Sequence, residues 1–191
     1  MGRVRAAAGL LALLPAVVAA QDAKPPAAPQ DVVVETDAGS FVIRLRPDLA
    51  PAHVAHFLKT AKAGGYDHTT FHRIIAGGII QGGDPLSKDP ARAKLYGTGG
   101  LDLLKAEISQ GDFARGMVAA ARKPSGLNTG GSQFFVVLRE QPSLKGQYTI
   151  FGEVVEGMDV VDKISLTPTS GDRPLSRVEI RSVTPRPAAG T

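Results

Sequence analysis

The sequence predicts a mainly β fold in one domain, either a closed barrel or a sandwich. Short runs rich in Val, Ile and Phe alternate with glycine-rich connections along most of the 191 residues, which is typical of all-β domains. Only two segments have helical periodicity, and no repeat or linker divides the folded part, which we place at residues 31–183. The hydrophobic share of 43% and the charged share of 21% are ordinary for a globular protein.

The first two predicted strands form a hairpin. Residues 32–36 and 40–46 are both rich in β-formers, and the short connection at residues 37–39 supplies a glycine for a positive φ. In the second strand every other residue from Phe41 to Leu45 is apolar. This alternation predicts one buried face and one wet face.

Two segments predict helices. In residues 51–62 the apolar side chains recur at helical spacing, a proline stands in the first turn, and a Gly-Gly pair follows the end. Residues 157–165 predict a second, short helix. The remaining apolar runs predict further strands at Ile74-Ile75, Ile79-Ile80, Met117–Ala121, Phe134–Leu138, Thr149–Val155 and Val178–Val183.

Composition excludes several classes of function. Cysteine is absent, which removes disulfides, thiol nucleophiles and cysteine zinc sites. Tryptophan is also absent and aromatic residues are only 5%, so a stacking platform for nucleic acid is not expected. The net charge is +4, but Arg3 and Arg5 lie in a segment we expect to be removed, which leaves 20 basic against 18 acidic residues. We therefore expect no nucleic-acid partner.

The four histidines do not predict a metal site. His53 and His56 are three residues apart, and His68 and His72 are four apart, but no HExxH-like pattern accompanies them. We expect neither a metal nor a cofactor.

The two ends of the chain differ from the domain. Residues 1–20 combine two arginines, a 15-residue apolar run and small residues before Gln21, which is the layout of a secretory signal peptide. The run is too short for a membrane span of about 20 residues, so we expect cleavage rather than insertion, and a periplasmic or secreted protein. A retained signal that tethers the chain to the membrane is the alternative. Residues 21–30 predict a Pro/Ala-rich linker and residues 184–191 a disordered tail.

One segment combines strand spacing with an unusual charge. Arg73 lies between apolar residues, and Gln81 follows eight positions later beside a Gly-Gly pair. If these two residues lie on paired strands with the same parity, both side chains point to one face. The simpler alternative is that Arg73 only faces solvent on the outside of a barrel.

Five motifs in one order resemble the cyclophilin-type peptidyl-prolyl isomerases, over about residues 32–180. The resemblance implies a closed eight-stranded antiparallel β-barrel capped by two α-helices, with the substrate groove on its outer surface. The motifs are Phe71–Ile75, Gln81–Asp84, Gly97–Gly100, Gly131–Phe135 and Phe151–Met158.

The resemblance also implies a set of site residues. Arg73 matches the catalytic arginine of the family, Gln81 its substrate-binding glutamine, and Phe135 the floor of the proline pocket. The other positions that match substrate-binding residues are Ile79, Ala121, Gln133, Leu144 and Tyr148.

Three positions depart from the family pattern. Gly78 stands where a phenylalanine is usual, Ser143 near a usual tryptophan, and Tyr148 at a usual histidine. The loop at residues 122–129 is also about two residues longer than the common form. We expect a shallower proline pocket and poor sensitivity to the cyclic peptide inhibitors typical of the family.

The expected activity is isomerisation of X-Pro bonds in polypeptides during the folding of exported proteins. The alternative is a low-activity module on the same fold that binds proline peptides as a chaperone or assembly factor, which Gly78 and Ser143 keep open. We expect proline-containing polypeptides as partners, and a monomer.

Overall fold

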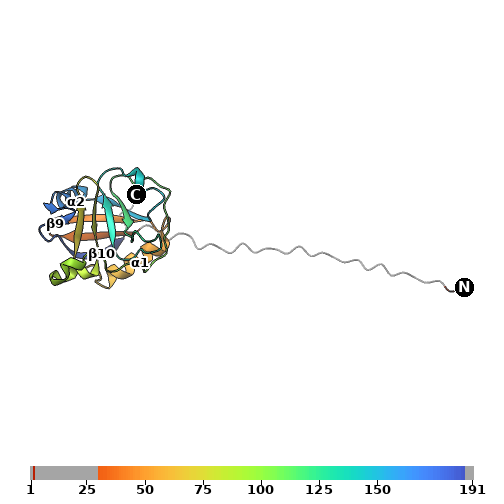
Figure 1. Cartoon of the computed structure of the whole chain (residues 1–191). Helices are drawn as coiled ribbons and strands as arrows, with labels where there is room; N and C mark the ends of the chain where they lie inside the picture. The colour runs from red at the N-terminus through yellow and green to blue at the C-terminus, as the bar shows by residue number, and fades with distance from the viewer. Residues whose placement is uncertain (1, 3–29, 188–191) are drawn as a thin grey trace.

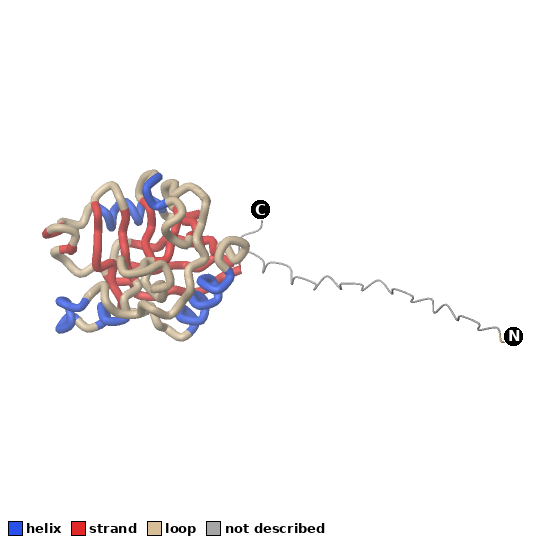
Figure 2. Tube along the Cα trace, turned by 45° about the vertical axis from the view of Figure 1, so that its right-hand side comes forward, coloured by secondary structure: helices blue, strands red, loops and turns tan. Residues whose placement is uncertain are grey.

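The computed structural model of the chain describes Gly2 and residues 30–187. Eight strands form its main body: β1 (Gln30–Thr36), β2 (Gly39–Leu45), β3 (Thr69–Ile75), β4 (Ile79–Gly82), β5 (Met117–Ala120), β6 (Phe134–Val137), β7 (Ile150–Glu156) and β10 (Glu179–Pro187). They pair antiparallel in the order β1-β10-β3-β4-β6-β5-β7-β2 and close into a barrel (Figures 1 and 2). The predicted fold is confirmed, and closure resolves the choice between barrel and sandwich.

Two α-helices complete the barrel core. α1 (Pro51–Lys62) has the predicted bounds, and α2 (Met158–Ser165) begins one residue after its predicted start, because Gly157 adopts a left-handed φ of 75°. α1 inserts Phe57 beside Tyr66, with ring centroids 4.8 Å apart. α2 contributes Val161 to the same core. Both helices therefore use an apolar stripe to cover the barrel interior.

Strand alternation divides the apolar side chains into two clusters. In β6, Phe134 and Val136 belong to the core inside the barrel, whereas Phe135 and Val137 belong to a second cluster. Because successive strand residues point to opposite faces, this second cluster lies on the outer wall. Its buried members are Phe113, Ala119, Ala121, Phe135, Val137 and Ile150.

Short elements join the strands where the sequence predicted only connections. Three are 3₁₀ helices: η1 (Pro85–Lys88), η2 (Pro90–Leu95) and η3 (Pro142–Leu144). Two are the strands of a small hairpin, β8 (Thr169–Ser170) and β9 (Arg173–Pro174). No helix in the described part of the chain has the length and apolar character needed to cross a membrane.

The structure corrects both predicted ends of the domain. β1 begins at Gln30, which the sequence placed in the linker, and β10 continues through residues 184–187, which it placed in a disordered tail. The reason is mutual pairing, with Gln30 opposite Pro187 and Val32 opposite Pro185. A proline removes only its own N–H donor from a ladder, so the strand persists. The predicted signal peptide and residues 21–29 and 188–191 lie outside the described residues.

Candidate active site

Arg73 and Gln81 meet on the outer wall of the barrel. They are direct partners in the β3–β4 register, and the Arg73 guanidinium donates from Nη1 to Gln81 Oε1 over 3.4 Å. The prediction that both side chains share a face is confirmed. The alternative, an arginine that contacts only solvent, is wrong.

A β-bulge in β3 sets the direction of Arg73. The register shifts between Phe71 and Arg73, and Phe71 and Ile74 are both buried in the barrel core although they are three residues apart. The two residues between them, His72 and Arg73, both line a hollow on the outer wall. An extra residue in one strand re-aims side chains in this way.

Gln81 is held from behind by Gln133. The Gln81 amide donates from Nε2 to Gln133 Oε1 over 3.0 Å, and Gln133 in turn donates to the Gly99 carbonyl over 2.7 Å. Gln133 is only 1% exposed and does not line the pocket beside Arg73. The resemblance implies that Gln133 is a substrate-binding residue; in the structure it is buried and bonded to Gln81.

A pocket of about 360 Å³ opens between Arg73 and the outer apolar cluster. Seven of the eight predicted site residues line it, so positions from residue 73 to residue 148 converge. These seven are Arg73, Ile79, Gln81, Ala121, Phe135, Leu144 and Tyr148.

The floor of this pocket is aromatic and apolar. Phe135 is buried and meets the Tyr148 ring edge-on, with centroids 5.4 Å apart. The Arg122 guanidinium carbon lies 4.6 Å from the Tyr148 ring centroid, which fixes the ring by a cation–π contact. Gly78 also lines the pocket and contributes no side chain of its own to that wall.

An ion pair orients the guanidinium of Arg73. Its Nε donates to Asp172 Oδ2 over 2.7 Å, and this bond lowers the pKa of the Asp172 carboxyl. The turn that carries Asp172 is itself attached to β3, because the Ile74 N–H donates to the Asp172 carbonyl over 2.7 Å. Asp172 has no signal in the sequence, since nothing in a Gly-Asp-Arg turn indicates a partner 99 residues away.

Two further arginines at the pocket are absent from the site residues predicted from the sequence. Arg122 and Arg139 both line it. Only Arg122 had a sequence signal, because it opens the loop that is longer than the family form. The described residues contain no cluster of three or more His, Asp or Glu side chains arranged to hold a metal ion.

Comparison with known families agrees with this arrangement. The family model for cyclophilin type peptidyl-prolyl cis-trans isomerases matches residues 31–185. The chain belongs to the cyclophilin family. It is accordingly a peptidyl-prolyl cis-trans isomerase.

Relatives of this cyclophilin occur in distant organisms. A probable peptidyl-prolyl cis-trans isomerase of Brucella suis is 39% identical over 170 residues, 86% of either chain. The Arabidopsis thaliana isomerase CYP18-2 is 36% identical over 83% of this chain and 94% of its own. A crystal structure of a Cryptosporidium parvum cyclophilin aligns with a TM-score of 0.75 at 29% identity, over 84% of this chain and 99% of that one. That protein has also been crystallised in the presence of the dipeptide Ala-Pro.

Proposed function

We propose that this cyclophilin rotates X-Pro bonds of exported polypeptides, with Arg73 as its catalytic residue and the Phe135 pocket as its proline site. The observation that carries the proposal is the position of the Arg73 guanidinium. It contacts Gln81 at 3.4 Å and lines the same pocket as Phe135. A proline ring on Phe135 therefore has a permanent cation beside it.

The reaction needs no nucleophile, because no bond is broken. Resonance stiffens the X-Pro amide and gives a barrier of about 18–20 kcal/mol, so uncatalysed exchange takes tens to hundreds of seconds. When the amide twists, the proline nitrogen regains its lone pair. A guanidinium that donates to this nitrogen stabilises the twisted state more than either planar isomer.

Arg73 has the chemistry for that bond. An arginine stays protonated and presents several donors in a rigid fork. A charge-assisted hydrogen bond contributes about 1.5–3 kcal/mol, which corresponds to roughly 10- to 150-fold in rate. The bonds of Arg73 to Asp172 and Gln81 fix the fork before substrate binds, which reduces the reorganisation needed in the transition state.

Gln81 is the group that holds the substrate backbone in this proposal. Its amide already contacts Arg73 and Gln133, so its orientation is set from two sides. One amide N–H remains for a carbonyl on the residue before proline. That contact fixes one end of the peptide while the other end rotates.

The export part of the proposal is supported by the signal-like residues 1–20 and by the absence of cysteine, which fits a compartment where disulfides are permitted but not required. N-terminal sequencing of the protein purified from a periplasmic fraction tests it, and we expect Gln21 as the first residue. A mature chain that begins at Met1 would contradict cleavage.

The decisive experiment compares wild type, Arg73→Ala and Arg181→Ala in a protease-coupled assay on a proline tetrapeptide. We expect Arg73→Ala to keep the fold and to lower kcat/KM at least tenfold, following the loss of one charged hydrogen bond. Arg181, on β10, pairs with Asp37 in the turn between β1 and β2 and lines none of the pocket, so its variant controls for a lost surface charge. Unchanged activity of Arg73→Ala would exclude the catalytic role.

The same assay separates the binding-module alternative, which the open wall at Gly78 favours. A binding module holds the tetrapeptide without accelerating its exchange. Wild-type turnover above the uncatalysed rate excludes that alternative.

A further inference from the structure

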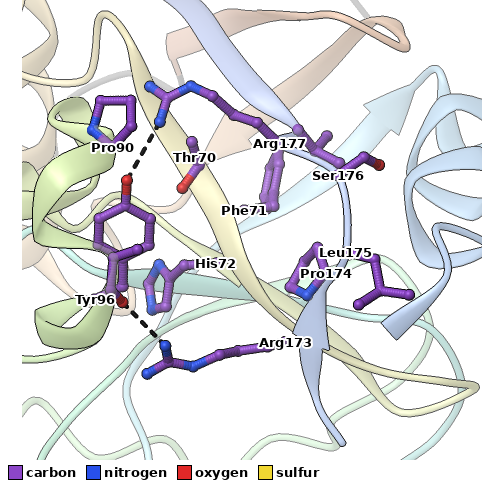
Figure 3. Close-up of a pocket in the computed structure, with 12 residues that line it drawn as sticks. Thr70, Phe71, His72, Pro90, Tyr96, Arg173, Pro174, Leu175, Ser176 and Arg177 are labelled. Carbon is purple, nitrogen blue, oxygen red and sulfur yellow. Dashed lines mark hydrogen bonds between the residues drawn. The ribbon is translucent and has the colours of Figure 1, made fainter. Parts of the chain in front are cut away.

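A second cavity lies beside β3, on the far side of His72 from the proline pocket. It has a volume of about 220 Å³, is open to solvent on one side, and is lined by β3, η2 and the segment at residues 173–178 (Figure 3). None of its residues belongs to the proline pocket. The lining is Thr70, Phe71, His72, Pro90, Ala93, Tyr96, Arg173, Pro174, Leu175, Ser176, Arg177 and Val178.

Two polar side chains in the wall of this cavity lack a partner. Both ring nitrogens of His72 and the hydroxyl of Thr70 are buried without a hydrogen bond to any described residue, and the residues are 7% and 3% exposed. Burial lowers the pKa of His72, which favours the neutral imidazole, a form with one donor and one acceptor. Buried polar groups are nearly always satisfied, which indicates an occupant that bonds to them.

A third hollow joins the cavity to the proline pocket. Its volume is about 600 Å³. It shares His72, Tyr96 and Arg173 with the second cavity, and it shares Arg73, Gln81, Arg122 and Tyr148 with the proline pocket. One groove therefore runs along the outer wall from the proline pocket to the unpartnered groups.

Arginine dominates the charge along this groove. Arg73, Arg122, Arg139, Arg173 and Arg177 line it, and Asp172 is the only acidic residue among the described residues of its wall. Asp172 is already paired with Arg73. The groove thus complements a negatively charged peptide.

Arg173 and Arg177 differ in what they can still bind. Arg177 donates to the carbonyls of Ser87 and His68, to Glu179 and to the Tyr96 hydroxyl, so it builds the wall. Arg173 makes one hydrogen bond, from Nη1 to the Ala93 carbonyl, and its Nε and Nη2 have no acceptor among the described residues. Figure 3 shows its guanidinium beside the ring of His72.

We infer that the second cavity is a subsite for an acidic side chain, Asp or Glu, of the proline-containing substrate. Arg173 is its ionic partner and His72 donates an N–H to the same carboxylate, while Thr70 binds a further polar atom of that segment. The inference rests on the proposed function, since the occupant is part of the peptide that the proline pocket holds. The enzyme should therefore prefer proline peptides with an acidic side chain at the matching position over neutral or basic ones.

A matched peptide series tests this subsite. Each peptide carries one proline and a single Glu, placed one to five residues before or after it, with a Gln peptide as its partner. NMR exchange measures kcat/KM, and the His72 ring signals report binding. We expect the Glu peptide to exceed its Gln partner about five- to tenfold at one or two adjacent positions, with a His72 shift only for the Glu peptide.

Variants assign the preference to the cavity. Arg173→Gln should bring the Glu-to-Gln ratio close to one, whereas Arg173→Lys should retain part of it. Arg181→Gln removes a surface charge that pairs with Asp37, and it should leave the ratio unchanged. An equal loss in both glutamine variants would mean long-range attraction alone, and would overturn the subsite.

The outcomes separate this inference from the proposed function. Turnover with ratios near one at every position, or His72 signals that respond to no peptide because the cavity holds only water, would overturn the subsite and leave the isomerase. Absence of turnover on any peptide would contradict the catalytic proposal. The Glu-to-Gln ratio of binding affinities from the same titration would then test the subsite: a ratio above one would support it, and a ratio near one would overturn it.

Discussion

Glu107, in a loop far from α1 in the sequence, caps the N-terminus of this helix. Its removal should destabilise the domain. Ala50, the residue before the helix, provides no side-chain cap. Instead the Glu107 carboxylate accepts from the Ala52 N–H at 3.0 Å and from the His53 N–H at 2.9 Å. It also contacts His53 Nδ1 at 2.5 Å. One carboxylate therefore satisfies three donors and faces the positive end of the helix.

The magnitude follows from these three contacts. Loss of an N-cap costs about 0.5–2 kcal/mol, and a charge at the helix terminus contributes about 0.3–1 kcal/mol. His53 is only 3% exposed, so leaving its ring nitrogen without a hydrogen-bond partner adds about 1–3 kcal/mol to the loss of stability. We expect Glu107→Ala to lower the free energy of unfolding by about 2–6 kcal/mol and Glu107→Gln, which keeps an acceptor oxygen, by about half as much.

The contribution of Glu107 depends on pH with a defined sign. Burial raises the pKa of its carboxyl, but the hydrogen bonds from His53 and the helix N–H groups outweigh this and lower the pKa below 4.5. A carboxyl with a lowered pKa stabilises the fold above its unfolded pKa, and this stability is lost as the pH falls through the folded value. Stability from Glu107 should therefore be complete above about pH 5 and decline below 4.5.

Urea unfolding at 25 °C and pH 7 measures the first effect, and the same titration repeated down to pH 3.5 measures the second. The difference between wild type and Glu107→Gln should shrink toward acid pH. A Glu107→Ala variant within about 0.5 kcal/mol of wild type would refute the capping role, since ordinary surface substitutions fall in that range.

Three further predictions concern the groove. Phe135→Leu should lower kcat/KM for proline peptides about tenfold, mainly through KM, because the flat floor of the pocket is lost while most of its volume stays; an unchanged KM would contradict a proline site there. Asp172→Asn should change kcat less than about fivefold, because the ion pair with Arg73 is 42% and 51% exposed and such pairs contribute about 0–1 kcal/mol; a loss as large as that of Arg73→Ala would show that Asp172 is indispensable for positioning Arg73. A cyclic peptide inhibitor of the family should give little thermal shift with wild type and more with Gly78→Phe, and stoichiometric binding to wild type would refute the account of the open wall.

Local patterns in the sequence predicted most of the strands but left barrel and sandwich open, and the closed eight-stranded barrel came from the family resemblance. The alternation from Phe41 to Leu45 predicted the buried side of β2, and all three apolar residues of that face are at most 1% exposed. The predicted wet face is wrong at Val42, which is only 4% exposed. The proline at position 51 and the glycines after the helix defined α1 to the residue. Such features succeed because a period of 2 or 3.6 is itself the condition for burying one face.

Contacts between distant segments were beyond the reach of those patterns. β8 and β9 have two residues each, too few to show a period, yet the turn between them supplies Asp172. Gln133 shows a second limit of the sequence. A motif indicates that a residue belongs to a site, but it does not indicate whether that residue contacts substrate or orients a neighbouring side chain. The burial of Gln133 and its hydrogen bond to Gln81 are seen only in the structure.

The location of the site on the outer wall follows from how the barrel is packed. Side chains such as Phe71, Phe134 and Ile80 pack together in the interior of the barrel, as the inward residues of small barrels generally do. The outward residues of the same strands are then the only regular positions left for chemistry, and the bulge at His72 adds one more of them. A single slip in the β3–β4 register would turn Gln81 inward against the core and separate it from Arg73. The core that stabilises the fold therefore also fixes the distance between Arg73 and Gln81. A rigid wall suits a reaction in which one end of a peptide is held while the other end rotates.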